Sequence, residues 1–199
     1  MRITAEDKQA TRERIEAAAL ELFRTRGFEA TTTRDIAKAA EIATGTLFNY
    51  FAAKEVIVAA LAEEGLAKAQ ATVAKQPSAE TLDEDLFALV AAELRQLRPL
   101  RKFITPVLET ALSPLSSATA SGGTSLRLQH LESVVRIARM HGVDEISPVA
   151  LQVYWSLYTG VLAYWAADKS PKQEETLALL DSSFHMFAAW LQDAPAEPR

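Results

Sequence analysis

One stretch of the sequence, Thr31 to Glu55, gathers residue types that are suited to contact DNA. It reads TTTRDIAKAAEIATGTLFNYFAAKE, and hydroxyl, amide, guanidinium and aromatic side chains are the groups that reach phosphates and base edges in a DNA groove. Gly45 and Thr46 fall at the expected start of a helix, where free N–H groups and the helix dipole favour a phosphate oxygen. The residues expected to stay exposed for such contacts are Arg34, Thr44, Gly45, Thr46, Phe48, Asn49 and Tyr50.

Catalytic and metal-binding chemistry is not indicated by the other polar residues of the chain. The histidines His130, His141 and His185 lack the partner spacing of a metal site. Ser182 and Ser183 lie near His185, but all three share one expected helix and no orienting acid is evident. The chain contains no cysteine, and so has no thiolate nucleophile and no cysteine-bound zinc. We therefore expect no enzyme activity, no metal and no other cofactor.

Three helices are expected to position the DNA-contacting residues. The first covers residues 11–26 and ends before Gly27, a common residue type after a helix C-terminus. The second begins with Thr33 as its N-cap, and the third begins at Thr44 and has apolar residues four positions apart. A short turn between the second and third helices lets their apolar faces meet at a steep angle, which is the helix-turn-helix geometry.

The distribution of charge decides how the net charge of -5 is interpreted. Residues 1–55 contain nine basic and nine acidic side chains, so the rest of the chain carries the whole acidic excess. A neutral N-terminal part with its basic groups on one face can bind DNA while an acidic body stays in solution. The lack of cysteine fits a reducing cytoplasm, and the sequence has neither a secretory signal nor an apolar run long enough for a membrane span. We expect a cytoplasmic protein without a membrane partner.

The whole chain is expected to be all-α, with about nine or ten helices, because apolar residues recur at helical spacing and no useful β-alternation occurs. All prolines lie at or beyond Pro77, which separates a proline-free N-terminal part from a larger body. We predict a helix-turn-helix DNA-binding domain over residues 1–55 and a helical ligand-binding and dimerisation domain over residues 56–199. Within the second domain, we expect a helical stretch from Leu100 to Leu112 and a mobile loop over residues 113–125.

The last two expected helices, residues 148–168 and 171–192, each begin with a Ser-Pro pair. The final helix has a heptad-like seam, whose members recur at intervals of three and four: Leu177, Leu180, Phe184, Phe187 and Leu191. The helix before it is apolar on several sides, and so needs partners on several sides. Periodicity alone leaves two interpretations open, namely the core of one chain and the interface of a dimer.

A ligand cavity between the middle helices is suggested by composition. Its candidate apolar lining consists of Phe87, Phe103, Leu108, Leu131, Val135, Trp155 and Tyr158, and its polar candidates are Glu109, His130 and Arg136. Ordinary core packing is an equally good interpretation of each residue. A cavity with this lining would favour an apolar or aromatic ligand.

Residues 11–61 resemble the DNA-binding domain of TetR-family transcriptional regulators. The family's patterns A-A-x-x-L-F, G-F/Y-x-x-T-T/S-x-x-x-I-A-x-x-A and G-T-L-Y/F-x-x-F-x-x-K-E occur here as Ala18 to Phe23, Gly27 to Ala40 and Gly45 to Glu55. The later helices resemble the family only in number, order and helical character. The resemblance favours the interpretation of the last two helices as a four-helix dimer interface.

The resemblance also implies roles for single residues. Thr33 and Thr46 would contact phosphates, Arg34 a base edge or phosphate, and Tyr50 and Lys54 the flanking DNA backbone. Thr44 and Gly45 would face the major groove, Phe48 would lie against a thymine methyl group or the backbone, and Asn49 would be a possible adenine reader. The sequence departs from the family pattern at Glu41, where Gly is common, at Ala43, where Ser or Thr usually caps the helix, and at Phe48, where Tyr is commoner.

Together these observations predict a ligand-responsive, DNA-binding transcriptional regulator. We expect a homodimeric repressor that a small apolar or aromatic effector releases from a near-palindromic operator on double-stranded DNA. The alternative is a constitutive dimeric DNA-binding or architectural protein without an effector. The sequence names neither the effector nor the operator, and it does not separate repression from activation.

Overall fold

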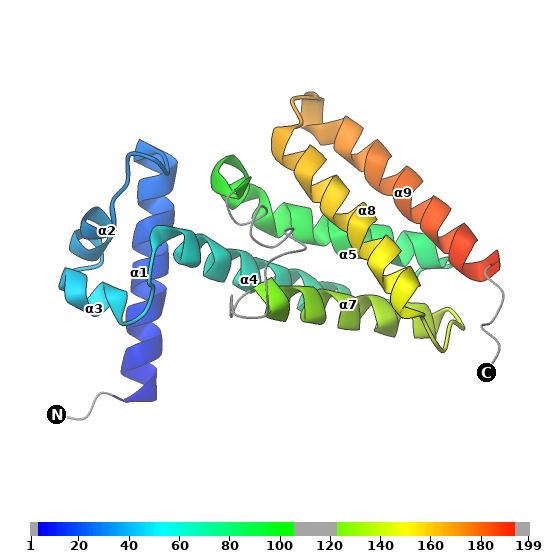
Figure 1. Ribbon diagram of the computed structural model, residues 1–199, viewed down its shortest axis with the longest axis horizontal. Coiled ribbons are helices and arrows are strands. Elements are labelled where there is room, and N and C mark those ends of the chain that lie inside the picture. Colours follow the sequence, from blue (N-terminus) through cyan, green and yellow to red (C-terminus); the bar gives the residue numbers. More distant parts are fainter. Residues whose placement is uncertain (1–3, 106–122, 194–199) are drawn as a thin grey trace. The chain divides into compact units, whose positions relative to one another are not determined.

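The computed structural model describes residues 4–105 and 123–193, and every regular element in these ranges is a helix (Figure 1). The α-helices are α1 (Ala5–Arg26), α2 (Thr33–Ala39), α3 (Thr44–Phe48), α4 (Lys54–Val73), α5 (Leu82–Leu97), α7 (Gly123–Met140), α8 (Pro148–Ala167) and α9 (Glu174–Asp193). Two short 3-10 helices, η1 (Arg98–Phe103) and η2 (Pro171–Gln173), accompany them. The all-α prediction is confirmed. The described ranges hold eight α-helices where about nine or ten helices were expected, and much of the expected stretch to Leu112 and of the loop at 113–125 lies outside them.

The chain divides into two compact units, Met1–Ala62 and Glu63–Arg199. The division falls inside α4, a few residues after the boundary predicted from the sequence. Ile57 and Val58, in the first turns of α4, are buried, so the beginning of this helix still belongs to the apolar core of the first unit. One continuous helix therefore runs from one unit into the other.

The first unit is built on α1, which packs against α2, while α2 packs against α3. A capping box between Thr4 and Asp7 starts α1 earlier than the predicted residue 11, because it satisfies N–H groups that the helix leaves without partners. Gly27, with a φ of 89°, ends the helix as predicted. Ile15 of α1, Ile36 of α2 and other apolar side chains form the core and have no exposed surface.

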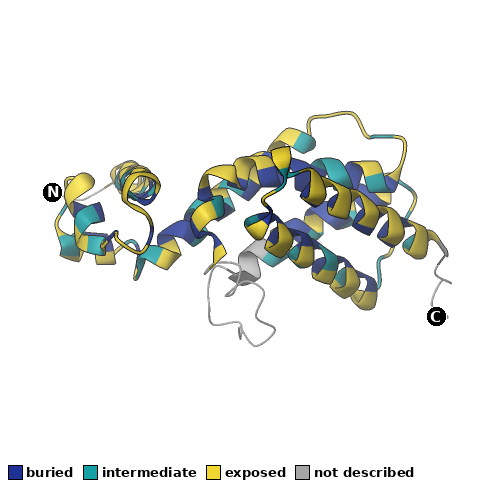
Figure 2. Cartoon of the chain, turned by 90° about the horizontal axis from the view of Figure 1, so that it is seen from above, coloured by how far each residue is buried: buried dark blue, intermediate teal, exposed yellow. Residues whose placement is uncertain are grey.

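The second unit is organised around α5, which packs against α7 and α9, while α8 packs along α9. Figure 2 shows buried residues on the sides that these helices turn towards one another and exposed residues on their outer sides. Tyr154 and Trp165 of α8 and Leu180 and Phe184 of α9 are among the fully buried side chains. Burial of such residues is the main stabilising contribution to the unit, at about 1.5–3 kcal/mol for each large apolar side chain.

The last helix begins later than the sequence predicts. Ser170 and Pro171 open the short 3-10 helix η2, and α9 starts only at Glu174, because Lys172 and Gln173 have positive φ angles of 54° and 61°. Asp168 holds this corner: its Oδ2 accepts a hydrogen bond of 3.1 Å from the backbone N–H of Thr176. Within the described ranges no helix is long and apolar enough to cross a membrane.

Candidate DNA-binding surface and ligand site

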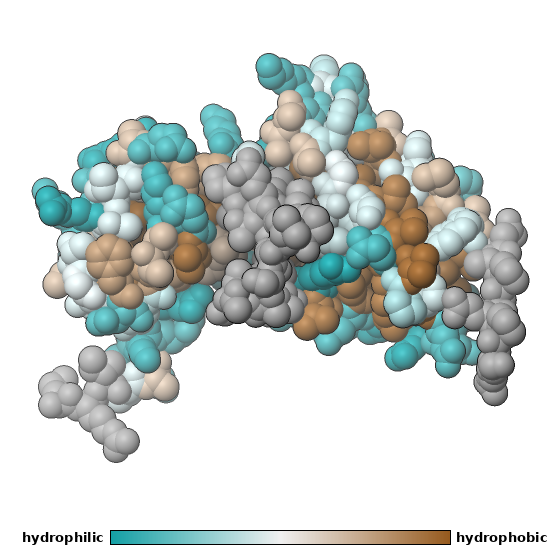
Figure 3. All heavy atoms as spheres, in the orientation of Figure 1, coloured by the Kyte–Doolittle hydropathy of each residue, from teal (hydrophilic) through white to brown (hydrophobic). Residues whose placement is uncertain are grey.

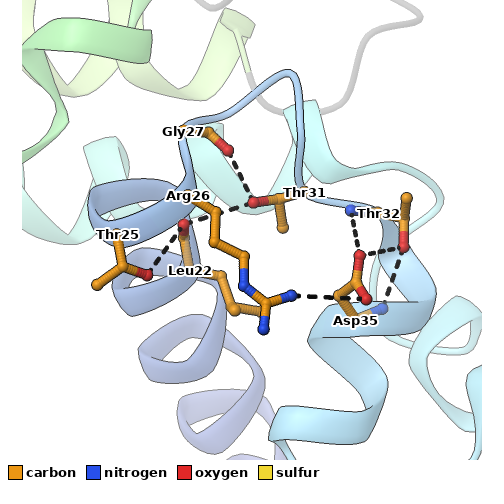
Figure 4. Close-up of polar contacts among 7 residues, drawn as sticks. All are labelled: Leu22, Thr25, Arg26, Gly27, Thr31, Thr32 and Asp35. Atoms are coloured by element: carbon orange, nitrogen blue, oxygen red, sulfur yellow. Dashed lines mark hydrogen bonds and ion pairs between the residues drawn. The ribbon is translucent and has the colours of Figure 1, made fainter.

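The loop between α1 and α2 is fixed by Thr31. Its hydroxyl Oγ1 donates to the carbonyl of Gly27 at 2.7 Å and lies 3.4 Å from the carbonyl of Leu22, as Figure 4 shows. The side chain is almost fully buried, so these carbonyls replace the water that the hydroxyl would otherwise bind. Thr31 thereby sets where α2 starts relative to α1.

The N-cap of α2 is Thr32, and not Thr33 as the sequence analysis predicts. Thr32 Oγ1 accepts a hydrogen bond of 3.2 Å from the N–H of Asp35, and the Thr32 N–H donates to Asp35 Oδ2 at 3.0 Å (Figure 4). The acidic residue three positions ahead completes the capping box, which a threonine alone does not specify. Hydrogen bonds from Thr32 also hold the pKa of Asp35 below its ordinary value. Thr33 becomes the first residue inside the helix and is half-buried, while Arg34 beside it is exposed.

The turn between α2 and α3 places Glu41, at the position where the family pattern commonly has Gly, in the left-handed conformation with a φ of 56°. The N–H of Ile42 returns to the carbonyl of Ala37 at 3.0 Å and closes the turn. Ala43 precedes α3 and provides no side-chain cap. Its carbonyl accepts the N–H groups of Thr46 and Leu47 at 2.9 and 3.1 Å, so α3 depends on backbone bonds and on its buried face.

The short helix α3 separates its residues into a buried and an open side. Leu47 has no exposed surface, and Phe51 just after the helix is 1% exposed. Phe48 keeps 51% of its surface exposed, and Gly45 and Asn49 are also exposed. The other predicted DNA contacts on this segment, Thr44, Thr46 and Tyr50, are half-buried. The ring of Phe48 is thus open to solvent on the outer side of α3.

Lys54 has a structural role in the first unit that the resemblance did not imply. Its Nζ donates to the carbonyl of Phe28 at 2.7 Å, lies 3.3 Å from the carbonyl of Thr31, and sits 4.2 Å from the centre of the Phe28 ring. The ammonium therefore joins the start of α4 to the loop after α1. The contact of Lys54 with the DNA backbone stays a prediction, and these hydrogen bonds fix where its ammonium group lies.

A buried polar cluster lies where α5, α7 and α8 meet. His130 Nδ1 lies 2.8 Å from Glu93 Oε1, and His130 Nε2 lies 3.0 Å from the hydroxyl of Tyr154. Glu93 and Tyr154 have no exposed surface and His130 is 1% exposed. The ring of Tyr158 stacks on His130 with 3.9 Å between their centres, and Trp155 is 5.3 Å from Tyr158. The structure thus brings together His130, Trp155 and Tyr158 from the predicted ligand residues.

Two features of Glu93 give this cluster its electrostatic character. Among the described residues, its Oε2 is buried without a hydrogen-bond partner. Burial first, and then the negative charge of Glu93, raise the pKa of both Tyr154 and Tyr158 well above the ordinary tyrosine value, and a hydrogen bond with Glu93 adds to the rise for Tyr158. Both tyrosine hydroxyls therefore stay protonated beside the buried carboxyl group.

A cleft of about 270 Å³ opens at the surface between α4 and α7. It is lined by Ala67, Gln70, Ala71, Ala74, Gln129, Glu132, Ser133 and Arg136. Gln70 connects the cleft to the buried cluster, because its Nε2 lies 3.4 Å from Glu93 Oε1. This lining is more polar than the sequence analysis expected, and Arg136 is the one predicted ligand residue among these side chains.

The remaining predicted ligand residues do not gather around this cleft. Phe103 is buried in η1, and Phe87, Leu131 and Val135 are half-buried on α5 and α7. Leu108 and Glu109 lie outside the described residues. The acid of the cluster is Glu93, which the sequence analysis missed. Its signal was available, because Glu93 stands in the apolar stripe of α5 where Leu86, Leu89 and Leu97 recur at helical spacing.

The predicted seam of α9 lies largely inside the protomer. Leu180, Phe184 and Phe187 are at most 2% exposed, so these three positions offer a second copy no surface. Leu191 is half-buried and Leu177 is 40% exposed. Figure 3 shows hydrophobic patches among hydrophilic ones on the face that it draws. Other apolar side chains of the two last helices are exposed. They are Val149, Val153 and Tyr164 of α8 and Leu179, Met186 and Trp190 of α9.

The helix-turn-helix segment matches a known family. Residues 15–61 match the model of the "Bacterial regulatory proteins, tetR family". This match begins in α1 and ends in α4, and so covers the whole of the candidate DNA-binding surface. No curated protein matches the chain.

Solved structures extend the likeness to nearly the full length. FadR of Thermus thermophilus, a TetR-family transcriptional repressor in complex with lauroyl-CoA, is 26% identical; the match covers 94% of this chain and 100% of that one, with a TM-score of 0.67. A TetR transcriptional regulator from Rhodococcus sp. RHA1 is 18% identical, with coverage of 90% and 97% and a TM-score of 0.70. FadR of Bacillus subtilis, in complex with stearoyl-CoA, is 18% identical, with coverage of 89% and 97% and a TM-score of 0.60. The last two show a shared fold.

Proposed function

We propose that this chain, a member of the tetR family of bacterial regulatory proteins by its residues 15–61, is a homodimeric repressor that a small effector releases from DNA. The observation that carries the proposal is the first unit, in which a buried core holds α2 and α3 and leaves Arg34, Gly45, Phe48 and Asn49 open. Exposed donors and a ring on a fixed helix pair fit the major groove of double-stranded DNA.

The proposed contacts divide into those that position the protein and those that read the sequence. Thr33, Thr44, Thr46 and Tyr50 are half-buried side chains with hydroxyl groups, and we assign them to phosphates or to the edge of the groove. Arg34 and Asn49 are exposed and can form paired hydrogen bonds with guanine and adenine, while the open ring of Phe48 suits a thymine methyl group. Lys54 contributes by holding α4 to the loop after α1.

For the dimer we assign the exposed faces of α8 and α9. Val149, Val153 and Tyr164 recur along one side of α8, together with Gly160, whose Cα position faces open space. Leu179, Met186 and Trp190 recur along one side of α9. Two copies of these faces make a four-helix contact with two-fold symmetry. Recognition helices related by this symmetry bind half-sites about 34–36 Å apart on a near-palindromic operator.

The dimer assignment separates exposed from buried positions on one helix. Met186→Glu should give a folded monomer, because Met186 is 60% exposed in the protomer. Leu180→Glu should instead unfold the second unit, because Leu180 has no exposed surface. Sedimentation velocity at micromolar concentration, with circular dichroism as the check on folding, measures both. A wild-type protein of monomeric mass would refute the assignment.

Effector binding is proposed for the second unit. FadR of Thermus thermophilus is a repressor described with lauroyl-CoA, and its match covers 94% of this chain. The cleft between α4 and α7 and the cluster behind it provide a polar place for a ligand in this unit. An effector releases DNA only if it binds the released conformation more tightly than the DNA-bound one.

The test is binding to the DNA upstream of the protein's own gene at about 0.15 M salt, with footprinting and a salt titration. Arg34→Ala should weaken specific binding by about 1–3 kcal/mol. Arg24→Ala is the matched control, since Arg24 is exposed on α1 and pairs with Glu21 at 3.7 Å. The absence of a footprint and of a salt-dependent shift would refute the repressor, and equal losses for both variants would refute the contact of Arg34.

A further inference from the structure

We infer that the effector carries a positively charged nitrogen on a compact apolar or aromatic body, and that this nitrogen binds the buried carboxylate of Glu93, reached through the cleft between α4 and α7. The inference rests on the proposed function, because it names the chemical class of ligand that the second unit takes. It also changes the expectation from the sequence, where the ligand was apolar or aromatic without a charge.

The first step is the unused acceptor of Glu93. The carboxylate has no exposed surface, and among the described residues its Oε2 forms no hydrogen bond of normal geometry, although the hydroxyl of Tyr158 interacts with Glu93 closely enough to raise the pKa of that tyrosine. A buried acceptor without a donor costs about 1–3 kcal/mol, and more when it is charged. A ligand that donates a hydrogen bond to Oε2 recovers this cost, and so the cluster binds a donor more strongly than a purely apolar ligand.

The second step is the sign of the charge. A neutral imidazole satisfies both contacts of His130, because Nδ1–H can donate to Glu93 Oε1 while Nε2 accepts from the hydroxyl of Tyr154. Neither ring nitrogen of His130 is left for Oε2 of Glu93, and after burial it is the negative charge of Glu93 that raises the pKa of Tyr154 and Tyr158. A cation gains from this field, whereas a carboxylate or phosphate would be repelled by it.

The third step is the aromatic surroundings. The rings of Tyr158 and His130 are stacked 3.9 Å apart, and Trp155 lies 5.3 Å from Tyr158. Trp155 already attracts one cation, since the guanidinium of Arg127 lies 5.3 Å from its ring centre. Aromatic faces beside a carboxylate are the usual surroundings of a bound organic ammonium group.

The fourth step is access. Gln70 lines the cleft, and its amide reaches Glu93 Oε1 at 3.4 Å, a long hydrogen bond that a stronger donor can replace. The cleft volume of about 270 Å³ lies just below the range of about 300–1,000 Å³ for small-molecule pockets. It therefore suits a compact ligand. Gln70 is also part of α4, the helix that begins at Lys54 in the first unit.

The experiment uses the full-length protein and three probes that share a phenethyl body: phenethylammonium, phenethyl alcohol and hydrocinnamate. Calorimetric titration gives the affinities, and the fluorescence of Trp155, with Trp155→Phe as the reference, reports whether the cluster is the site. We expect phenethylammonium to bind about tenfold more tightly than the alcohol and hydrocinnamate to bind most weakly. Equal affinities, or no binding of any probe at millimolar concentration, would overturn the inference.

Glu93→Gln keeps the size of the side chain and removes its charge, so it should abolish the preference for phenethylammonium over the alcohol. Glu132→Gln is the matched control, because Glu132 lines the cleft but is exposed, and this variant should keep most of the preference. A preference that survives in Glu93→Gln, or that disappears in Glu132→Gln alone, contradicts the assignment to Glu93. The preference of the wild-type protein decides the matter if Glu93→Gln does not fold.

The inference and the proposed function fail in different ways. Loss of the ammonium preference with an intact footprint on DNA would remove the ligand class and leave the repressor. Ammonium binding without any footprint would support the site and refute the repressor. The two measurements are therefore made on the same preparation.

Discussion

Both units have capping carboxylates at the surface, Glu84 being one in the second unit, and they differ in what their buried carboxylates bind: Glu16 of the first unit pairs with Arg12, four residues before it on α1. In the first unit, Asp7 and Asp35 lie at helix N-termini on the surface, where they complete capping boxes with Thr4 and Thr32. In the second unit, Glu93, Asp85 and Asp168 are at most 7% exposed and bind side chains from other segments. Charges at caps shape a helix without depending on distant parts, whereas buried charges tie distant parts together and make them sensitive to a ligand or to pH. The buried carboxylates of the second unit thus connect different segments of the chain.

The largest effect expected from this comparison is a loss of stability in one unit alone. Leu47→Ala removes a side chain without exposed surface from α3, and a substitution of this kind costs about 2–5 kcal/mol. We expect faster hydrogen–deuterium exchange in α1 to α3 and unchanged exchange in α5 and α9. Phe184→Ala should give the opposite pattern, since Phe184 is buried in α9. Equal loss of protection in both units for either variant would show that they unfold as one.

The second prediction concerns the buried carboxylate Asp85 at the start of α5. Its Oδ2 accepts from Ser78 Oγ at 2.6 Å and lies 2.7 Å from His141 Nε2, and its Oδ1 accepts from the Ala79 N–H at 3.0 Å. Burial raises the pKa of Asp85. The hydrogen bonds from Ser78, His141 and Ala79 together lower this pKa by more than burial raises it, so the pKa lies below its ordinary value.

The pH dependence follows from this direction. Because the folded pKa is below that of the unfolded chain, the contribution of Asp85 to stability is complete above about pH 4 and disappears as the pH falls below that value. Asp85→Asn should lower the free energy of unfolding by about 1–3 kcal/mol at neutral pH. It should also flatten the loss of stability between about pH 5 and pH 2. Urea unfolding followed by exchange in α5 and α7 measures this, and an unchanged acid profile would contradict the role of Asp85.

A smaller effect separates two neighbouring threonines of the first unit. Thr32→Ala removes the N-cap of α2 and should lower stability by about 1 kcal/mol, within the usual range of about 0.5–2. Thr33→Ala, one position later, should leave stability almost unchanged and weaken DNA binding instead. Thermal unfolding and DNA titration of the same two proteins measure the difference. Equal stability losses would mean that the capping box does not decide where α2 begins.

These threonines also show how far the sequence determines the first unit. The helix-turn-helix, its buried residues and the positive φ at Glu41 follow from local signals, because caps, turns and short helices depend on neighbours within about four residues. The N-cap was predicted one residue too late, at Thr33 instead of Thr32, because any of three consecutive threonines can cap a helix. Only Asp35, placed three residues after Thr32, decides among them.

The second unit was predictable as a set of helices but not as a site. Glu93 and Tyr154 lie about sixty positions apart, and both meet His130 only because α5, α7 and α8 pack together. The same packing turns the apolar side of α9 inward, so Leu180, Phe184 and Phe187 became core residues instead of a dimer surface. Helical spacing gives the face of a helix but does not say whether its own chain or a second copy covers that face.

The smallest predicted effect returns to the turn of the first unit. Glu41 has a φ of 56°, a conformation that costs a residue with a Cβ about 1–2 kcal/mol relative to glycine. Glu41→Gly should therefore stabilise the first unit, by less than about 1 kcal/mol, since glycine also gains freedom in the unfolded chain. Ala39→Gly is the control, because Ala39 is exposed at the last position of α2 and glycine there should destabilise by up to about 1 kcal/mol.

The signs of the stability changes in Glu41→Gly and Ala39→Gly are measured by thermal unfolding, with hydrogen exchange in α2 and α3. They test whether the conformation of the turn lowers the stability of the first unit. If Glu41→Gly stabilises the turn and leaves DNA binding unchanged, the glutamate is a tolerated strain in a unit whose shape is set by Leu47 and Ile36. If it stabilises the turn and weakens DNA binding, the strained turn is itself part of how α3 is presented. A loss of stability would show that the side chain of Glu41 makes a compensating contact. The structure of this turn would then depend on more than neighbouring residues, and the contrast with the second unit, whose site depends on the packing of distant helices, would not hold there.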